Sequence, residues 1–499
     1  MRKDCVRSPA GLLMRCAIGL AAAAMSVTGA LAAAGNLVLA STYQIDRLYP
    51  HPQTAGTQLY VDVLFDPLVT VTKEGIQPRL ASAWSVSPDG KTYTFTLRKD
   101  ATFHDGTKFD AAAAKAALDY TLKPEHGARI PPYLPKSTVE VTGPHEIKVT
   151  LPAAAPELLG VLSQYPMFKI GADGAATTVG TGPFKLDRFD SRQSARFVRN
   201  DAYWAGPAKL DAYEIRMFPD MPSALLGLEA GEIDAVIRPP IPDVARLEAT
   251  KGLKLTKFPD TGNMMWGVNA RPGRATTDPR VRKALDLAFD RQRFVDVALG
   301  GIGTPTNVVW PPSSPAYVPA DETWKFDLAA AKALLAEAGV SGLDIRLVMS
   351  SGVSQEAVSF APIFQADLAS IGVKAKIENY DTSEWLDKIT KGDFDMYMTI
   401  YGNTGADPAL AFTSGNFRLT NNIPGFASPE YSALEERGRL ETDPAKRIAI
   451  YRDLNKYMQQ QAFALPFAQN PIMFIHSDKV KGLALNSINN LMATGITVD

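Results

Sequence analysis

Cysteine is nearly missing from this sequence, and what little there is lies close to its start. The 499 residues contain two cysteines, Cys5 and Cys16, and both lie within the first 34 residues. The rest of the chain therefore has no thiol nucleophile, no disulfide and no cysteine-based metal site. Its stability must come from the burial of apolar side chains.

Long apolar runs are missing as well. After residue 34, no stretch reaches the about 18 consecutive apolar residues of a membrane-spanning helix. The charge is almost balanced, with 52 basic and 53 acidic residues. Such a surface gives no electrostatic basis for binding nucleic acid or an anionic membrane. We therefore expect no nucleic-acid partner and no stable membrane insertion.

The motifs of common enzymes are also missing. The five histidines show no HExxH-type pairing, and no GxSxG nucleophile elbow occurs. The stretch GGIGTP at 300–305 lacks the third glycine of a dinucleotide-binding loop, and it follows a predicted helix instead of a strand. The sequence thus favours a protein that is not an enzyme and that holds no cofactor and no metal.

What the sequence does contain begins with an export signal. Basic residues precede an uncharged run, rich in alanine and leucine, that extends to Ala34 and ends in three alanines. These basic residues are Arg2, Lys3, Arg7 and Arg15. Small residues after an apolar run suit a cleavage site. The pattern predicts a signal peptide over residues 1–34, cleaved after Ala34 or, as a second choice, after Ala32.

After removal of this leader, we expect a freely diffusing periplasmic protein. Cys16 stands before the apolar run, whereas a lipid-modified cysteine would follow it, so a lipoprotein is not favoured. Cleavage takes away four basic residues and one acidic residue and changes the formal charge from −1 to −4. The roughly 465 residues that remain are too many for one core, so we expect two or three domains.

Strand and helix patterns alternate along the chain, which indicates an α/β architecture. Tyr93, Phe95 and Leu97 alternate with threonines after a turn at Pro88-Asp89-Gly90, and this predicts a β-hairpin. Three helices are predicted to begin after Asp278, Asp327 and Asp443, because each aspartate can cap the helix that follows it. The first of these helices carries Val281, Leu285, Ala288 and Phe289 at helical spacing.

Several long segments resemble the family 5 bacterial extracellular solute-binding proteins, the peptide/nickel class, in the same order and at similar spacing. They cover roughly residues 37–481. The segments are PRLASAWSVSPDGKTYTFTLRKDATFHDGTKFDA, GTGPFKLDRF with the stretch that continues to GEIDA, WGVNARPG with DPRVRKALDLAFDRQRFVDVALGGIGTP, FDLAAAKALLAEAG, and DPAKRIAIYRDLNKYMQQQAFALPF.

This resemblance implies an α/β, two-lobed periplasmic-binding-protein fold of the class II, cluster C type, with an extra domain inserted in the first lobe. Domain I would comprise residues 35–66, 179–265 and 468–499, domain II residues 67–178, and domain III, the second lobe, residues 266–467. Hinge closure would enclose the ligand, and the membrane permease would recognise the closed form. In this family the HDG triplet at His104 is a structural turn, and we interpret it so here.

In peptide-binding relatives, a loop of the form WxADYxDP supplies an aspartate that pairs with the free amino group of the peptide. The matching segment, MTIYGNTGADPALAF at 398–412, aligns through Asp407 and places Thr404 where that aspartate would be. A hydroxyl offers a hydrogen bond but no charge-assisted contact. We therefore expect a ligand other than an ordinary oligopeptide.

The N-terminal stretch and an asparagine-rich tail look more like the nickel-type branch, whose members bind metals as small organic chelates. Arg129 lies within about one residue of an arginine that contacts the chelator's carboxylates in that branch. No histidine occurs between Trp385 and Phe426. The histidine ligand of that branch is therefore absent, which weakens direct metal ligation.

Position along the chain adds further candidates for the ligand site. We expect Trp266 and Asn269 where the chain crosses between lobes, and Tyr401 and Asn403 beside the cleft loop. Aromatic faces and amides suit a small polar organic ligand, since binding pockets combine apolar walls with a few placed polar groups. Each of these side chains could instead belong to the core.

Three further residues are candidates because of their loops. Arg418 could pair with a ligand carboxylate or be a solvated loop charge. Tyr43 and Arg47 lie in the loop after the first predicted strand, and both are candidates for contact with the ligand.

The sequence thus predicts the substrate-binding component of an ABC importer. It would act as a monomer that captures a small polar organic solute and delivers it to an inner-membrane permease. The solute could be an amino-acid-derived or opine-like compound, a metal chelate or a short peptide. A periplasmic hydrolase of a small amide or ester, and a binder specific for di- or oligopeptides, are the alternatives.

Overall fold

Strands from distant parts of the chain meet in a seven-stranded sheet. Their order is β11-β12-β13-β1-β14-β22-β15. β1 runs parallel to both β13 and β14, and the other neighbours are antiparallel. The bounds are β1 (Ala34–Ser41), β11 (Phe184–Asp190), β12 (Ser194–Arg199), β13 (Leu210–Met217), β14 (Ala235–Ile237), β15 (Leu253–Phe258) and β22 (Ile472–Ser477).

The structure is a computed structural model that describes residues 34–50, 55–72, 75–123, 134–259, 262–402 and 407–499. Except for Ala34, the predicted signal peptide lies outside these ranges. Every helix within them is too short or too polar to cross a membrane.

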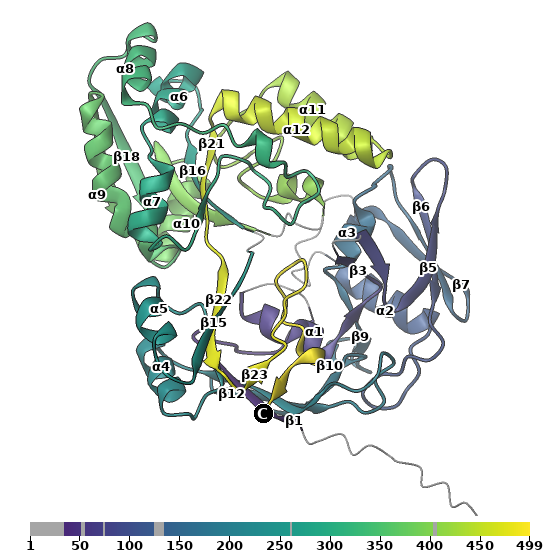
Figure 1. Cartoon of the computed structure of the whole chain (residues 1–499). Helices are drawn as coiled ribbons and strands as arrows, with labels where there is room; N and C mark the ends of the chain where they lie inside the picture. Colours follow the sequence, from purple (N-terminus) through teal and green to yellow (C-terminus); the bar gives the residue numbers. More distant parts are fainter. Residues whose placement is uncertain (1–33, 51–54, 73–74, 124–133, 260–261, 403–406) are drawn as a thin grey trace, which may run out of the picture. The chain divides into compact units, whose positions relative to one another are not determined.

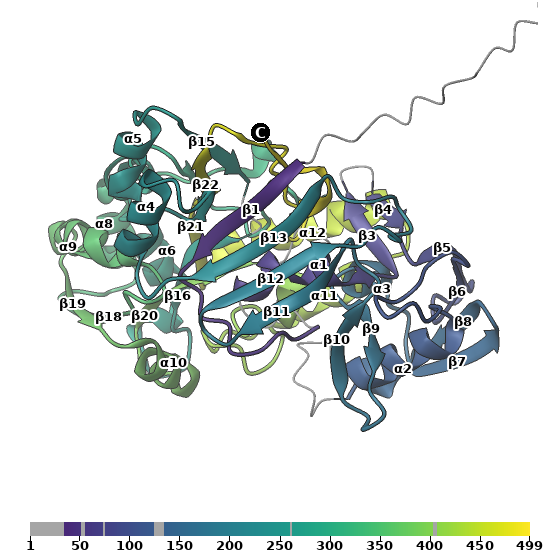
Figure 2. The same ribbon diagram turned by 90° about the horizontal axis from the view of Figure 1, so that it is seen from below.

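Burial on both faces stabilises the seven-stranded sheet. Figure 2 looks onto it, with purple β1 beside β13, followed by β12 and β11. Leu37 and Leu39 of β1 belong to a large apolar core on one face. Ala40 packs on the other face against helices α4 (Met221–Glu229) and α5 (Ile241–Glu248). The period of two in a strand sends neighbouring residues to opposite faces, which explains this division.

A four-stranded sheet in the first half contains the predicted hairpin, which is confirmed. β5 (Ala81–Val86) and β6 (Thr92–Leu97) pair antiparallel, and Gly90 in the turn has a φ of 68°. Tyr93, Phe95 and Leu97 are buried as their alternation predicts. Strands β8 (Glu146–Thr150) and β7 (Thr138–Gly143) complete the sheet.

Shorter elements lie in the same half of the chain, and most of them contribute residues to the apolar core of this sheet. They are α1 (Val61–Leu64), β2 (Asp66–Pro67), β3 (Val69–Thr72), β4 (Gly75–Pro78), α2 (Ala111–Thr121), α3 (Leu158–Leu162), β9 (Pro166–Ile170) and β10 (Ala176–Gly180). Near the C-terminus, β23 (Val480–Lys481) pairs with β24 (Thr497–Val498).

A second, six-stranded sheet has the order β17-β21-β16-β20-β18-β19. β18 runs parallel to β19 and to β20, whereas β16 is antiparallel to β20 and β21. The bounds are β16 (Asn263–Val268), β17 (Thr304–Pro305), β18 (Leu343–Met349), β19 (Val373–Asn379), β20 (Met396–Tyr401) and β21 (Ala464–Gln469).

Helices cover this second sheet, and Figure 1 shows α6 to α10 grouped around β16 and β18. They are α6 (Pro279–Leu287), α7 (Arg291–Ala298), α8 (Leu328–Glu337), α9 (Gln355–Ser370), α10 (Thr382–Lys391), α11 (Pro429–Leu440) and α12 (Pro444–Gln461). Trp266 packs in the apolar core on the side of α6 to α9. Met265, the preceding residue of β16, packs in a separate core that includes residues of α11 and α12.

The three predicted helices are confirmed as α6, α8 and α12. Asp278, Asp327 and Asp443 each accept a backbone N–H of the first turn, as N-cap residues do. The apolar pattern placed Ala288 and Phe289 in the first of these helices, but α6 ends before them. Both are nevertheless buried, because the chain stays against the core after the helix ends.

Two connections carry the chain between the two large sheets. β15 ends at Phe258 and β16 begins at Asn263, while β21 ends at Gln469 and β22 begins at Ile472. β15 pairs with β22 in one sheet, and β16 pairs with β21 in the other. The strands that flank the two crossings therefore lie side by side, and Figure 1 shows teal β15 next to yellow β22.

Sheet membership can be compared with the predicted domains. The strands of the six-stranded sheet lie between residues 263 and 469, close to the predicted 266–467. Those of the four-stranded sheet lie within 67–178, and those of the seven-stranded sheet fall in the three predicted parts of domain I except for Ala34 at the start of β1. The limits of the domains themselves stay a prediction.

The HDG triplet forms a turn that ties two segments together. Nδ1 of His104 accepts the N–H of Gly180 at 3.2 Å, and Nε2 faces the carbonyl of Gly182 at 3.2 Å. An imidazole that accepts at Nδ1 and donates at Nε2 is neutral. Burial lowers the pKa of His104 to about 4, which favours this neutral form. We therefore infer a structural role for His104.

We predict that His104 makes part of the stability depend on pH. The unfolded imidazole takes up a proton near pH 6.5 and the folded one near pH 4, so this contribution is complete above pH 6.5 and is lost as the pH falls toward 4. The full difference corresponds to about 3 kcal/mol. In His104→Gln, whose amide can accept and donate at the same two places, the free energy of unfolding in urea should fall less between pH 7 and pH 4. Equal losses in the two proteins would contradict this role.

Candidate ligand-binding site

The carboxyl ends of parallel strands lie at one edge of the seven-stranded sheet. β1 ends at Ser41, β13 at Met217 and β14 at Ile237. The pairing of Ala40 with Val236 keeps the ends of β1 and β14 in register. Ligands of open α/β sheets bind at such an edge, because the loops that follow the strands meet there. The loops after these three strands form the first wall of the candidate site.

These loops are bonded to one another. Nε2 of Gln44 donates to the carbonyl of Phe218 at 2.9 Å, and the N–H of Phe218 donates to the carbonyl of Ser41 at 2.8 Å. Arg238, the first residue after β14, has a φ of 53°, and its N–H donates to the carbonyl of Met473 at 2.7 Å. A positive φ is unfavourable for a residue with a side chain. The surrounding bonds thus hold Arg238 in a strained backbone conformation at this edge.

Tyr43 and Arg47 lie in the loop after β1, where the sequence places them. Tyr43 is half-buried, and its N–H donates to Oγ of Ser41 at 3.0 Å. Arg47 is exposed, and its guanidinium carbon lies 3.8 Å from the ring centre of Tyr49. Their contact with a ligand stays a prediction.

The second wall is the edge of the six-stranded sheet where the chain enters β16. Asn263 pairs there with Tyr401 of β20. Nδ2 of Asn263 donates to the carbonyls of Val308 and Val309 at 2.9 and 3.0 Å and to the hydroxyl of Tyr401 at 3.0 Å. The hydroxyl donates to the carbonyl of Val309 at 2.6 Å. The polar group of Tyr401 is thus engaged within the protein, and its predicted ligand contact stays untested.

Two polar side chains that the sequence analysis missed lie at the second connection. Gln469 closes β21, and Asn470 follows it. Nε2 of Gln469, Oδ1 of Asn470 and Oδ1 of Asn263 are buried and have no hydrogen-bond partner among the described residues. Buried polar groups in proteins are nearly always paired. The available signal was a lone amide at the end of an otherwise apolar strand, ALPFAQ.

Trp266 lies away from this edge. It stands in the middle of β16, and 1% of its surface is exposed. Its ring packs against those of Phe289, Phe364 and Phe467, with centroid distances of up to 6.1 Å. The expectation that Trp266 lies at the crossing is therefore wrong, because the chain enters β16 three residues earlier, at Asn263.

Asn269 lies beyond the opposite end of β16 and is fully buried. Its Nδ2 donates to the carbonyls of Gly392 and Phe394 at 3.1 and 2.8 Å, and its Oδ1 accepts the N–H of Arg271 at 3.2 Å. These bonds connect the chain after β16 to the segment that precedes β20. Asn269 is thus not at the crossing either, and its amide is used in holding loops together.

The remaining predicted residues lie in or near loops. Arg418 is exposed, and its Nε donates weakly to the carbonyl of Thr413 at 3.4 Å. Arg129, Asn403 and Thr404 lie outside the described residues. The ligand contacts of all four stay predictions.

Asp407, at the end of the predicted ligand loop, forms a two-point ion pair with Arg447. The guanidinium nitrogens lie 2.5 and 2.8 Å from the two carboxylate oxygens. One oxygen also accepts the N–H of Ala409 at 2.9 Å, which caps the short 3-10 helix η6 (Pro408–Thr413). Both oxygens of Asp407 are therefore hydrogen-bonded within the protein, and Arg447 supplies its ionic partner.

The η6 segment contacts the first half of the chain. Leu410 belongs to the same apolar core as Tyr93 of β6. Burial raises the pKa of Tyr93 to about 12, and the charges of Glu157, Arg447 and Asp407 act on it as well. The Asp407–Arg447 pair thus lies within electrostatic reach of the hairpin sheet.

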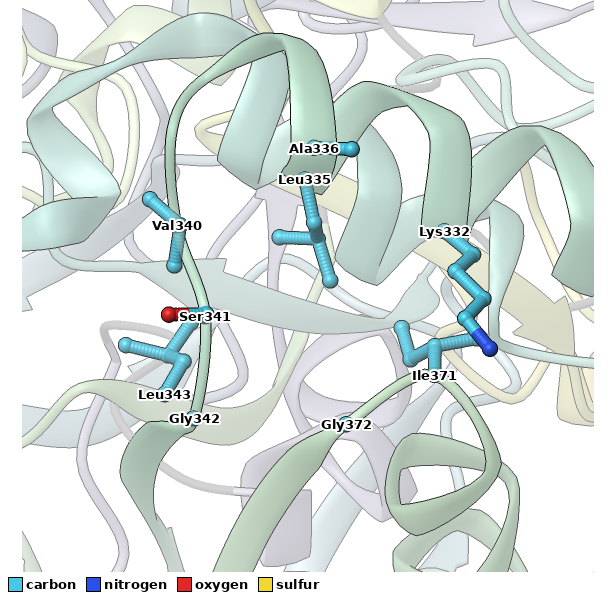
Figure 3. Close-up of a pocket in the computed structure, with 9 residues that line it drawn as sticks. All are labelled: Lys332, Leu335, Ala336, Val340, Ser341, Gly342, Leu343, Ile371 and Gly372. Atoms are coloured by element: carbon cyan, nitrogen blue, oxygen red, sulfur yellow. The ribbon is translucent and has the colours of Figure 1, made fainter.

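A cavity of about 250 Å³ lies elsewhere, and Figure 3 shows the residues that line it. They come from α8, from the turn that leads into β18 and from the turn that leads into β19. The cavity therefore lies at the amino ends of these parallel strands, whereas ligands bind at carboxyl ends. Among the described residues, no three histidine, acidic or cysteine side chains are grouped as metal ligands.

Two α/β sheets joined by two crossings of the chain suit a two-lobed protein whose lobes close about a hinge. The chain belongs to the bacterial extracellular solute-binding proteins of family 5, whose family model matches residues 75–422. This membership confirms the resemblance seen in the sequence.

Curated relatives are similar over most of their length. The chain is 30% identical over 423 residues to the glutathione-binding protein GsiB of Salmonella typhimurium, which covers 81% of this chain and 82% of that protein. It is 28% identical over 488 residues to GsiB of Escherichia coli O6:K15:H31, covering 93% and 94%.

Solved structures share the fold. NikA from Brucella suis, in complex with Fe(III)-EDTA, is 25% identical with a TM-score of 0.84, and the match covers 93% of this chain and 100% of NikA. AgaA from A. tumefaciens R10, in complex with agropinic acid, is 24% identical with a TM-score of 0.77, covering 93% and 99%.

The chain is therefore a solute-binding protein of an ABC importer with a two-lobed α/β fold, as the sequence predicts. Its relatives are binding proteins and not enzymes.

We predict that Arg447→Met lowers the free energy of unfolding by about 3–5 kcal/mol, because it leaves Asp407 as an uncompensated, largely buried charge. Urea denaturation at pH 7 measures this change. Arg437→Met, at an exposed residue of α11, is the matched control and should change stability by no more than about 0.5 kcal/mol. The double variant Arg447→Met/Asp407→Leu should recover much of the loss. A loss below about 1 kcal/mol in Arg447→Met would show that solvent screens the pair.

Proposed function

We propose that the chain captures a small amino-acid-derived solute that bears carboxylates, and that glutathione is its first candidate. The observation that carries this proposal is the likeness to glutathione-binding proteins, which extends over 82% of their length at 30% identity. The match covers 81% of this chain.

The state of Asp407 supports a ligand of this kind. Its two carboxylate oxygens are engaged by Arg447 and by a backbone N–H, and the family resemblance aligns Thr404 with the aspartate of peptide-binding relatives. An ordinary peptide would bring an isolated ammonium group that needs an ionised partner. In glutathione the amino group stands beside a free carboxylate, because the glutamyl residue is linked through its side chain. The ligand's own charges then partly balance one another.

Arginines near the walls suit the carboxylates of such a ligand. Arg47 follows β1, Arg238 follows β14, and Arg418 follows η6. A guanidinium can donate two parallel hydrogen bonds to a carboxylate. Tyr43 on the same loop as Arg47 adds an aromatic face and a hydroxyl.

We propose that the two connections between the sheets act as the hinge. Ligand stabilises the closed form only to the extent that it binds this form better than the open one. The permease would then take the ligand from the closed form of a monomer. We also propose that the chain reaches the periplasm by cleavage of its leader, after Ala34 or after Ala32.

A metal chelate is the second candidate ligand. NikA, whose structure contains Fe(III)-EDTA, has a TM-score of 0.84 against this chain. A chelate carries its own metal ligands, so it can bind although the described residues contain no grouped set of metal ligands. A hydrolase remains the alternative from another class, and it would convert the ligand where a binding protein returns it unchanged.

We predict that glutathione raises the unfolding temperature of the exported chain. A ligand at about 100 times its dissociation constant adds about 2.7 kcal/mol to the free energy of unfolding. Thermal unfolding should be followed with reduced glutathione, the dipeptide Met-Leu, agropinic acid and Fe(III)-EDTA at equal concentrations. Glutathione should give the largest shift, and chromatography should recover it intact.

Two outcomes would contradict this proposal. A large shift with Met-Leu and none with glutathione would show an ordinary dipeptide binder and would refute the argument from Thr404. Breakdown of glutathione, in proportion to the amount of protein, would favour the hydrolase.

A further inference from the structure

One leucine of the predicted second lobe is part of the apolar core of the first lobe. Leu410 lies in η6, and 8% of its surface is exposed. Every other buried member of this core among the described residues comes from 37–237 or 472–496, which lie in the predicted first lobe. Burial of an apolar side chain is favourable. The contact of Leu410 with this core therefore stabilises an arrangement in which the two lobes touch.

A cation of the second lobe is tied to the same segment. Arg447 lies in the first turn of α12, and bonds within its own lobe fix its position. Its guanidinium binds both oxygens of Asp407, and its Nε donates to the carbonyl of Gly438 at 3.0 Å. Asp407 is the N-cap of η6, the helix that carries Leu410. The apolar contact and the cation thus belong to one unit of the second lobe.

A carboxylate of the first lobe acts on this cation. Glu157 directly precedes α3 and is 3% exposed. Burial lowers the pKa of Arg447, but Asp407 and, from the first lobe, Glu157 raise it above its ordinary value. Tyr93 of β6 lies at the same place, because its hydroxyl donates to the carbonyl of Ala155 at 2.8 Å, two residues before Glu157. The two lobes therefore meet in a contact that is partly apolar and partly ionic.

Both parts of this contact depend on closed lobes. A buried carboxylate is costly in free energy unless cations or hydrogen-bond donors compensate it. When the second lobe moves away, Arg447 leaves together with Asp407, because their two-point pair lies within that lobe. Glu157 then loses the attraction of this cation, and Leu410 becomes exposed to water. Opening therefore costs free energy even when no ligand is present.

We propose that Leu410, Arg447 and Glu157 form a latch that populates the closed form in the absence of ligand. The latch rests on the hinge proposed above and on no particular ligand. A ligand then shifts an equilibrium that already exists, instead of creating the closed form. The strength of the latch sets how much of the ligand's binding free energy is used for closure.

The test measures the ratio of open to closed molecules without ligand. The chain after residue 34 has no cysteine. Ser85→Cys on β5 and Asp453→Cys on α12 therefore place one dye at an exposed position of each lobe. Energy transfer between the two dyes in single molecules of the exported chain should resolve a closed and an open population in the wild type.

Two substitutions should weaken the latch. Glu157→Gln keeps the shape of the side chain and removes its charge, so it should raise the ratio of open to closed molecules about fivefold, as expected for a partly solvated ion pair. Leu410→Ser removes apolar burial and should raise the ratio about tenfold or more. Thermal unfolding shows that each variant is folded, and Glu157→Gln alone decides if Leu410→Ser does not fold.

Glu435→Gln is the matched control. Glu435 is also a buried glutamate, 5% exposed, but it lies on α11 within the second lobe. Its substitution should leave the ratio unchanged. A shift in Glu157→Gln no larger than in this control would overturn the inference. A wild-type chain that is entirely open without ligand would do the same, as would a double variant Glu157→Gln/Leu410→Ser that stays as closed as the wild type.

Failure of the proposed function gives a different result. Glutathione would then leave the ratio unchanged in every form of the chain, whereas the difference between the wild type and Glu157→Gln without ligand would remain. If glutathione closes the wild type, but Glu157→Gln without ligand has the same ratio as the wild type, only the latch fails.

Discussion

The strands that flank the two crossings between the large sheets are paired with each other, and among the described residues this constraint organises the whole protein. β15 leads into β16 and β21 leads into β22, and each strand pairs with its counterpart on the same side of the crossing. A two-strand link of this kind can bend without breaking the hydrogen bonds inside either sheet. It also places the ends of β16, β20 and β21 together at one edge, which is where the unpaired amides lie.

Much of the fold could be predicted because its signals are local. An aspartate before an amphipathic segment marks a helix start, and alternation after a proline-glycine turn marks a hairpin; both appear in the structure. The leader and the family likeness also come from contiguous stretches. In each case the residues that carry the signal are neighbours in sequence, so no knowledge of the tertiary structure is needed.

The candidate site was harder to predict, because its members come from strands that are far apart in sequence. The side chains of Trp266 and Asn269 have the chemistry of ligand contacts, yet one packs in an aromatic core and the other bonds loops together. Whether an aromatic or an amide faces a ligand or the core depends on strand register, which the sequence does not show. Gln469 was overlooked for the same reason. Its neighbours in β21 are apolar, and only the pairing of β21 with β16 brings it near a polar side chain of another strand.

The adjacency of the two connections also has an evolutionary consequence. Neighbouring strands lie about 5 Å apart, so the segment from β16 to β21 leaves the rest of the protein and returns to it at nearly the same point. In terms of gene structure, this segment is an inserted domain whose first and last residues lie close together in space. Domain insertions are tolerated where the two ends of the inserted segment are close together. A lineage could therefore exchange the whole second lobe, and with it half of the ligand contacts, while the seven-stranded sheet kept its strand order.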